Sequence, residues 1–558
     1  MIRNSKLSFE KAVTRLNSKN LTDLWITSCL LSCIDYFSSW DKRVNIFMPM
    51  VHVQSVSMLQ RAILESKSQH YKRDIFDSKD FPDVYNALVK AADDVDLLRG
   101  EAKPDTLLRS FFGTLANCQI RFQERDLRRR LGRSYGMLHD IPLTCKGILN
   151  QRHGKNFFDL TTVFLEKFGL SVKDFLLIGF VVLTLIHERF KPYSTIQSQV
   201  EDYLVQSGRR HLSNRERSLL LTQLIDKSKA WQEALIFQPQ NLVVSGIPIF
   251  AIEKVKAYLQ LVARSTQQLR ELLHSVKAYS EGPLAERVSP LERYPIVALE
   301  DDTYIVPNLS YFEMALTELP HFILQESYTD NRYNELRGYI HELYLQKLIE
   351  NCLPSLTVIP EITYHRAKEE VSGPDLTLIE DNKLIVLEAK AKRMRVASRV
   401  SPASEALVDD IQGAFSAFEK IPSKVNDLHS GLPQYLSYQV ILDMTRDTEP
   451  LAVVVMGDGV YFMAEFLQDY LGNNPEHFLN QYFYPFCLIP LDKFEDAVEI
   501  AATGHLSLYD LLREYWEDSK ITTVRDHPAE DFRGRKPTGI NPLTKKYIDT
   551  LFAELKAS

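Results

Sequence analysis

Several familiar signatures of function are missing from this sequence of 558 residues. Its six cysteines form no CxxC pair, and no Cys/His cluster has zinc-ligand spacing, which excludes the common structural zinc motifs. The GxGxxG dinucleotide fingerprint is absent. Residues 147–155 end in Gly154 and Lys155, but the spacing is wrong for a P-loop, and Asn156 stands where Ser or Thr is needed. If the protein serves an ATP-driven process, we therefore expect a separate ATPase subunit.

Long hydrophobic runs are also scarce. The longest, residues 175–186 (FLLIGFVVLTLI), is shorter than the about 20 residues that span a bilayer. Charged residues flank it on both sides, so it predicts a buried central helix and no membrane association. No secretory signal is visible at residues 1–4, which predicts a reduced, cytoplasmic protein. Cys29 and Cys33, four apart in a helical stretch, are expected to be buried thiols.

The composition is that of a folded protein, with 45% hydrophobic and 25% charged residues. The chain is too long for one ordinary core, so two or three domains are expected. A net charge of -7 argues against a uniformly basic coat for nucleic acid. It remains compatible with a local basic cleft, because screening limits the reach of distant charges.

Apolar residues at spacings of three and four predict helices through most of residues 1–288. The clearest segments are residues 21–37, 81–98, 107–131 and 252–279. Ser213 and Glu216 form a capping-box pattern that opens a helix over residues 215–227. We interpret residues 1–288 as a helical regulatory, targeting or assembly region of one or two subdomains, which could bind a partner protein or an ATPase subunit.

The pattern changes near residue 289. Strands are expected at residues 294–299 and 304–306, forming a hairpin in a connector over residues 289–333. A helix at 334–350, strands at 356–364, 375–379 and 383–389, a helix at 404–420 and a strand at 451–456 then give the order αβββαβ. This order predicts a mixed sheet flanked by helices over residues 334–470, followed by an α-rich extension over 471–558. The predicted fold class is therefore multidomain α+β.

Residues 373–390 (GPDLTLIEDNKLIVLEAK) carry the chemistry. Two strand-like runs meet at Asp381 and Asn382, which tolerate the positive φ of a two-residue hairpin loop. That loop pairs Glu380 with Lys383 and continues until Asp375 falls opposite Glu388. Directly opposed side chains lie on one face with Cβ atoms about 4.5–5.5 Å apart.

Two carboxylates this close repel each other unless a proton or a divalent cation lies between them. Strand alternation places Lys390 on the same face as Glu388 and turns the Ala389 side chain away. Oxygen ligands from Asp375, Glu388 and the Ala389 carbonyl suit Mg²⁺, with Mn²⁺ as a substitute. Such a metal could activate water and act as Lewis acid in phosphodiester hydrolysis. Lys390 would orient or deprotonate the water and stabilise developing charge.

Pro374 and Asp375, followed by Glu388, Ala389 and Lys390, resemble the signature of the PD-(D/E)XK, or restriction-endonuclease-like, nuclease superfamily. The resemblance covers residues 294–456 and implies a restriction-endonuclease-like α/β core and magnesium-dependent deoxyribonuclease activity. It also implies two further site residues. Glu342, in the helix before the motif, matches an acidic residue beside the metal, with a catalytic and metal-binding role. Gln412, in the helix after the motif, would contact metal-bound water or phosphate.

Each candidate has a plainer alternative. The acids and Lys390 could form ion pairs on a solvated hairpin, although the apolar residues 384–387 indicate a central strand whose charges would be buried. Glu342 could be an ordinary exposed helix residue. A basic run after the motif either contacts phosphate or is a solvated face; its members are Lys392, Arg393, Arg395 and Arg399. Residues 125–133 (RDLRRRLGR) and 209–211 are either a DNA track or packing elements.

The main hypothesis is a cytoplasmic, metal-dependent nuclease with DNA favoured over RNA, similar to effectors of prokaryotic antiviral defence systems. The alternative is a catalytically inactive nuclease fold that binds nucleic acid or serves as a scaffold. A third hypothesis is a phosphodiesterase acting on RNA or a nucleotide signal. Cleavage of both DNA strands with one site per chain would favour a homo-oligomer.

Overall fold

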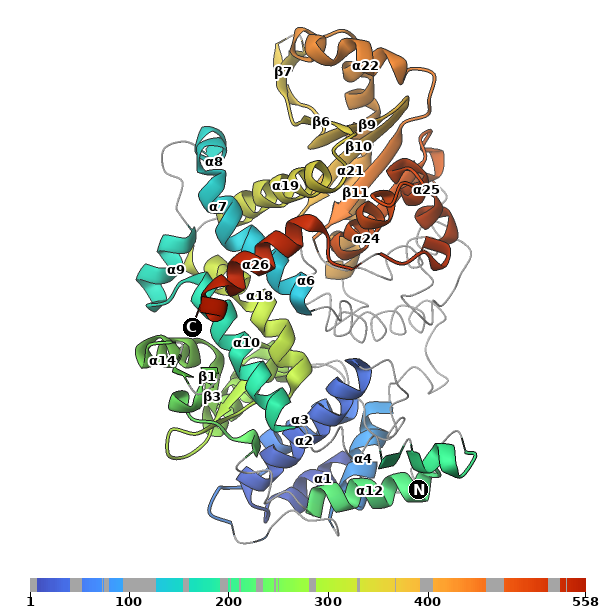
Figure 1. Ribbon diagram of the computed structural model, residues 1–558. Coiled ribbons are helices and arrows are strands. Elements are labelled where there is room, and N and C mark those ends of the chain that lie inside the picture. Colours follow the sequence, from blue (N-terminus) through green and yellow to red (C-terminus); the bar gives the residue numbers. More distant parts are fainter. Residues whose placement is uncertain are drawn as a thin grey trace. The chain divides into compact units, whose positions relative to one another are not determined.

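The architecture comes from a computed structural model of the chain (Figure 1). It describes residues 8–40, 53–72, 74, 80–93, 127–153, 160–190, 199–200, 202–209, 212–226, 234–244, 247–248, 250–280, 288–328, 332–366, 368–391, 405–457, 476–519, 532–537 and 539–557. The chain divides into two compact units. Unit 1 comprises Met1–Pro104, Thr162–Ile323 and Phe552–Ser558, and unit 2 comprises Asp105–Thr161 and Leu324–Leu551.

These units cut across the boundary predicted at residue 288, which falls inside unit 1. Asp105–Thr161 was predicted as part of the N-terminal helical region, but it belongs to unit 2. Hydrophobic periodicity reports which residues are helical and carries no information on which distant segment a helix packs against. The structure confirms the coarser expectation of a mixed α and β protein.

Unit 1 is built mainly from helices. They are α1 (Phe9–Leu16), α2 (Leu21–Trp40), α3 (Val53–Glu65), α4 (Phe81–Asp93), α9 (Leu160–Phe168, which begins just before the unit), α10 (Val172–Arg189), α12 (Asn214–Asp226), α14 (Ile252–Val262), α15 (Thr266–Ser275), α16 (Lys277–Ser280), α17 (Pro290–Arg293) and most of α18 (Leu309–Ser327). The capping box of α12 is confirmed: Glu216 accepts from the Ser213 N–H at 2.7 Å, and Ser213 Oγ accepts from the Glu216 N–H at 3.3 Å. Most of the helix predicted over residues 107–131 lies outside the described residues.

A small sheet interrupts the helices of unit 1, with strand order β3 (Ala263–Ser265), β4 (Ile296–Ala298) and β5 (Tyr304–Ile305). The predicted hairpin is confirmed, since β4 pairs antiparallel with β5 and Asp301 and Asp302 take positive φ. The single helix predicted over residues 252–279 is wrong. It is broken at β3, where Ser265 caps α15 and starts a new helix. A second two-stranded ladder pairs β1 (Val243–Val244) with β2 (Ile247–Pro248).

Helix α10 carries the long apolar run and is largely buried, as predicted. Among the described residues, no single helix combines the length and apolar character of a membrane span, although the bent pair α9 and α10 meets that test when taken together. Cys29 and Cys33 are buried free thiols, which confirms the expectation for this pair.

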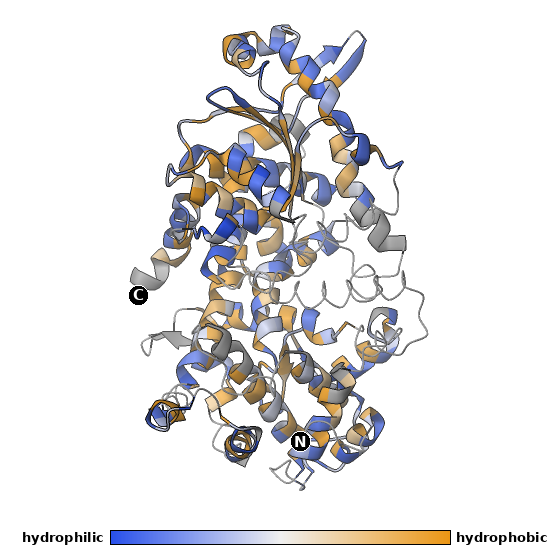
Figure 2. Ribbon diagram, turned by 90° about the vertical axis from the view of Figure 1, so that its right-hand side faces the viewer, coloured by the Kyte–Doolittle hydropathy of each residue, from blue (hydrophilic) through white to orange (hydrophobic). Residues whose placement is uncertain are grey.

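Unit 2 contains a five-stranded mixed sheet in the order β12-β11-β10-β9-β6. The strands are β6 (Thr357–Pro360), β9 (Leu376–Glu380), β10 (Lys383–Lys390), β11 (Leu451–Met456) and β12 (Phe486–Pro490). Strand β9 is antiparallel to both its neighbours, whereas β10, β11 and β12 run parallel. All of β11 and most of β10 are buried, as expected for central strands covered on both faces, and Figure 2 shows the sheet largely in the colours of hydrophobic residues.

Four helices from the Leu324–Leu551 segment of unit 2 pack on this sheet (Figure 1). Helix α19 (Arg332–Cys352) contacts β6 and β10, α21 (Glu405–His429) contacts β10 and β11, and α24 (Leu491–Ala501) and α25 (Leu508–Ser519) contact the β11 and β12 side. The predicted helices 334–350 and 404–420 are therefore present and longer than expected. Unit 2 also contains α6 (Leu127–Tyr135), the π-helix η3 (Gly136–Asp140), α7 (Ile141–Thr144), α8 (Lys146–His153), the short 3₁₀ helix η7 (Phe478–Gln481) and most of α26 (Pro542–Ala557).

The strand predicted over residues 356–364 is two strands. Strand β6 stays in the main sheet, while β7 (Thr363–Arg366) pairs with β8 (Glu369–Ser372) in a separate hairpin. This hairpin lies beside η6 (Pro433–Tyr438) and α22 (Gln439–Met444), since the rings of Tyr364 and Tyr435 are 5.8 Å apart. Figure 1 shows this group beyond the ends of β6 and β9.

Candidate active site

The β9–β10 hairpin places the two candidate acids, and its register is the one predicted from the sequence. Lys383 pairs with Glu380, and the ladder continues to Leu387 opposite Leu376. Asp381, in the two-residue turn, takes a φ of 53°. Continuing this register by one step places Asp375 opposite Glu388, and the two carboxylates are close enough to repel each other. The Ala389 N–H donates to Asp375 Oδ2 at 2.7 Å and fixes this carboxylate at the end of β9.

Glu388 lies inside the unit, where its side chain contacts two lysines. It is 5% exposed, and its Oε1 accepts a hydrogen bond from Lys424 Nζ at 2.5 Å. Lys390 Nζ lies 3.9 Å from the other carboxylate oxygen, Oε2, and the Lys390 side chain is 35% exposed. Asp375, Glu388 and Lys390 are therefore brought together, and Lys390 is the member that solvent reaches.

The electrostatics reflect four charges in a small volume. Burial raises the pKa of Glu388, and the neighbouring charge of Asp375 raises it further. Lys424 and Lys390 act in the opposite direction, but the net pKa stays above the usual value. Two carboxylates and two ammonium groups are formally neutral together. A solvated hairpin with loose ion pairs does not describe Glu388, because this carboxylate is buried in a central strand.

Lys424 was missed by the sequence analysis. It lies on α21 among the buried apolar residues Ile421, Val425 and Leu428, and it is itself 8% exposed. A signal for it exists in the sequence. Lys424 comes three residues after Ile421 and four before Leu428, so it lies on the same apolar face of the helix and points to the core. A buried lysine requires an anionic partner. The predicted helix ended at residue 420, so this signal lay outside the segment considered.

The other predicted residues are not all assembled here. Glu342 is half-buried on α19, between the buried residues His341 and Leu343. Within the described part of the chain, no three His, Cys, Asp or Glu side chains form a group that could hold a metal, so Glu342 does not join Asp375 and Glu388 as a third acid. Gln412 is exposed on α21. Four predicted phosphate contacts lie outside the described residues: Lys392, Arg393, Arg395 and Arg399.

The donor set nevertheless suits one hard divalent cation. Among the described residues, Asp375 uses only Oδ2 in a hydrogen bond, and the nearest cation to Glu388 Oε2 is Lys390, beyond hydrogen-bonding distance. One oxygen of each carboxylate is thus available. Mg²⁺ commonly binds through one or two carboxylates and completes its shell with water and substrate oxygens. Asp375 and Glu388 fit that pattern without a third acidic side chain.

Two arginines of the basic segment 125–133, Arg129 and Arg133, are packing elements. Arg133 makes two hydrogen bonds to Glu495, at 2.9 and 2.6 Å, and Arg129 donates to Asp496 and Glu499 at 2.6 and 2.8 Å. All five side chains are at most 16% exposed. These guanidinium groups bind α24 and do not form a track for DNA. In the second basic segment, the structure describes Arg209, which pairs with Glu216 on the surface at 2.8 Å.

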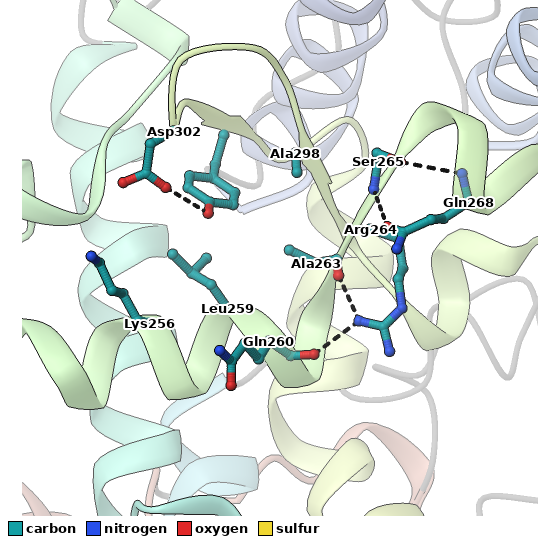
Figure 3. A pocket seen from close by; sticks show the side chains of 10 residues that line it. Lys256, Leu259, Gln260, Ala263, Arg264, Ser265, Gln268, Ala298 and Asp302 are labelled. Atoms are coloured by element: carbon teal, nitrogen blue, oxygen red, sulfur yellow. Dashed lines mark hydrogen bonds between the residues drawn. The ribbon is translucent and has the colours of Figure 1, made fainter.

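Unit 1 carries a cavity of about 510 Å³ between α14, β3, the start of α15 and the β4–β5 hairpin (Figure 3). Its polar groups are largely used within the protein. Arg264 donates to the carbonyl oxygens of Gln260 and Ala263 at 2.8 and 2.7 Å, and its guanidinium stacks on Tyr294. Tyr304 donates to Asp302 at 2.9 Å. The acid pair of unit 2 has the stronger chemical signature, because its Glu388 is buried beside a second acid.

No family model, no curated protein and no solved structure matches this chain.

Proposed function

We propose that the chain is a divalent-metal-dependent nuclease of the PD-(D/E)XK type, with DNA favoured over RNA as substrate. The observation that carries the proposal is the convergence of Asp375, Glu388 and Lys390 at the end of a hairpin in the middle of a mixed sheet. The element order α19, β6, β9, β10, α21, β11 supports it, since it contains the αβββαβ succession that the sequence resemblance implies. The β7–β8 hairpin is an addition to that succession.

Each residue of the site has a different role in the proposed reaction. Asp375 and Glu388, with the Ala389 carbonyl, would hold a Mg²⁺ or Mn²⁺ ion that supplies Lewis acidity and activates water. The Ala389 N–H keeps the Asp375 carboxylate oriented. Lys390, partly exposed beside Glu388, can donate to a phosphate oxygen or orient the attacking water. The buried faces of β10 limit solvent around the acids and strengthen these interactions.

Cleavage assays with matched variants test the proposal. Wild type, Asp375→Asn and Lys390→Met are incubated with supercoiled plasmid, single-stranded DNA and RNA, in Mg²⁺, Mn²⁺ or EDTA. Asp381→Asn is the control for the acid, because it lies at the other end of the same hairpin and Asn accepts its positive φ. Lys368→Met, an exposed lysine between β7 and β8, is the control for Lys390.

We expect metal-dependent cleavage by wild type and both controls, and a loss of about 10²-fold or more in the two site variants. The preferred polymer identifies the substrate class. A different outcome supports the alternative, an inactive nuclease fold that acts as a scaffold: nucleic acid bound equally by all five proteins, with no cleavage in either metal. Unit 1 would then be tested as a binding region for a partner protein.

A further inference from the structure

We propose that Lys424 is an internal competitor of the divalent cation, because its ammonium group and the metal ion bind the same carboxylate of Glu388 and one displaces the other. This inference rests on the proposed function in one respect, since it takes Asp375 and Glu388 as the metal site. It goes further by assigning a role to a residue outside the PD-(D/E)XK pattern.

The first step is the mutual dependence of the two buried charges. Lys424 is 8% exposed and Glu388 is 5% exposed, and Lys424 Nζ lies 2.5 Å from Glu388 Oε1. Within the described residues, Lys424 makes no hydrogen bond or ion pair with any other group. A buried ammonium group without a counter-charge is strongly disfavoured, and Glu388 is the counter-charge of Lys424 in this position.

The second step is the need of the acid pair for positive charge. Asp375, held by the Ala389 N–H, lies beside Glu388 at the end of the hairpin, and two carboxylates this close repel each other. Lys390 is too far away, at 3.9 Å, to compensate at hydrogen-bonding distance. Lys424 is therefore the cation that neutralises Glu388 most directly. A divalent ion bound to the same carboxylate would also neutralise it, with twice the charge.

The third step is that the ammonium group and the metal ion would repel each other across the Glu388 carboxylate. Mg²⁺ binds carboxylate oxygens at about 2.0–2.1 Å, which would bring it within a few ångströms of the ammonium group on Oε1. Two cations at that separation in a buried site repel strongly. The lysine side chain has four methylene groups, so its ammonium can withdraw while α21 stays in place. Metal binding then includes the displacement of Lys424, which weakens the apparent affinity.

Direct measurement of metal binding tests this without any substrate. Mn²⁺ is titrated into the full chain and the free ion is followed by electron paramagnetic resonance. Lys424→Met removes the charge and keeps most of the volume, and we expect Mn²⁺ to bind on the order of tenfold more tightly. Lys424→Arg keeps the charge and can bind the carboxylate through two N–H groups, so we expect weaker Mn²⁺ binding than in wild type. The two variants are therefore expected to change the Kd for Mn²⁺ in opposite directions.

A second readout is thermal stability. Lys424→Met leaves Glu388 without its main partner, so its Tm in EDTA should fall below that of wild type, and saturating Mn²⁺ should raise it by more. Lys493→Met is the matched control, because Lys493 is a buried lysine of the same unit that pairs with Asp496 at 3.4 Å. It should change Tm in EDTA and leave the Kd for Mn²⁺ unaltered.

The outcomes separate this inference from the proposed function. If wild type binds Mn²⁺, Glu388→Gln abolishes that binding, and Lys424→Met binds no more tightly than wild type, Lys424 is not a competitor and the metal site stands. If neither wild type nor Lys424→Met binds Mn²⁺, the metal site and the inference both fail. If Lys424→Met cannot be purified folded, tighter or unchanged binding by Lys424→Arg overturns the inference.

Discussion

The substitution Glu495→Gln tests how the basic helix α6 is held in unit 2. Glu495 is fully buried on α24, where it accepts two hydrogen bonds from Arg133 and one from Tyr344 at 2.5 Å. Arg129 Nε lies 3.8 Å from the same carboxylate. Burial raises the pKa of Glu495, but these partners outweigh burial and the net pKa is lowered. The carboxylate is therefore ionised and paired at neutral pH.

The magnitude follows from what the substitution leaves behind. Glutamine removes the charge and turns an amide NH₂ toward one of the Arg133 nitrogens, so Arg133 loses this anion, whereas Arg129 keeps its pairs with Asp496 and Glu499. Removing one partner of a buried ion pair costs about 3–5 kcal/mol, because the remaining charge is uncompensated. For a unit of this size we expect Tm to fall on the order of 10 °C.

The assay is urea denaturation combined with hydrogen exchange read by mass spectrometry. Exchange reports α6 and α24 separately, which matters because a chain with two units need not unfold in one step. Glu517→Gln is the control, since its pair with Arg513 on α25 is about half exposed and should contribute roughly 0.5 kcal/mol or less. If Glu495→Gln lowers the free energy of unfolding no more than this control does, the reasoning is refuted. The interpretation of α6 as an exposed basic track would then be favoured.

Two other substitutions have definite expected results. In Gly373→Ala the new Cβ would overlap the hydroxyl of Tyr435, which is buried and cannot move aside easily, and it would lie 3.2 Å from the Ile362 carbonyl. The start of β9 should shift, and we expect kcat for cleavage to fall about tenfold or more, with far-UV circular dichroism unchanged. In Glu499→Gln the pH dependence of Tm should flatten. Burial raises the pKa of Glu499 to about 7 from 4.5, so the folded state binds more protons in that window, and this stabilisation is lost as pH rises through it. As the pH rises from 4.5 to 8, wild type should lose stability relative to the variant by roughly 1.4 kcal/mol per unit of pKa shift, which melting curves measure. If the Tm of the two proteins depends on pH in the same way, the raised pKa of Glu499 is contradicted.

The parts of the site that were predictable depend on local chain geometry. A two-residue turn at Asp381 and Asn382 sets the register, and the register alone brings Asp375 opposite Glu388. Strand alternation places Lys390 on the same face of β10 as Glu388. These relations need only the period of a strand and the length of a loop, which the sequence contains.

The parts that were missed depend on contacts between distant segments. Lys424 approaches Glu388 across 36 positions, and Arg129 reaches Glu499 across 370. Periodicity can indicate that a lysine or an arginine faces a core, but it does not identify the partner in that core. The same limit explains why Asp105–Thr161 was predicted with the N-terminal helices when it belongs to unit 2.

Buried charge alone does not identify a functional site, because two such clusters lie among the described residues of unit 2. The cluster around Glu495 is enclosed, with no side chain of its five more than 16% exposed, so it suits a structural role. The cluster around Glu388 differs in two ways. Lys390 is 35% exposed, and Asp375 is half-buried at the end of a strand, so both are accessible from solvent. Solvent access, in addition to burial, is the reason that we propose the catalytic chemistry at Glu388 and expect a metal ion to displace Lys424 there.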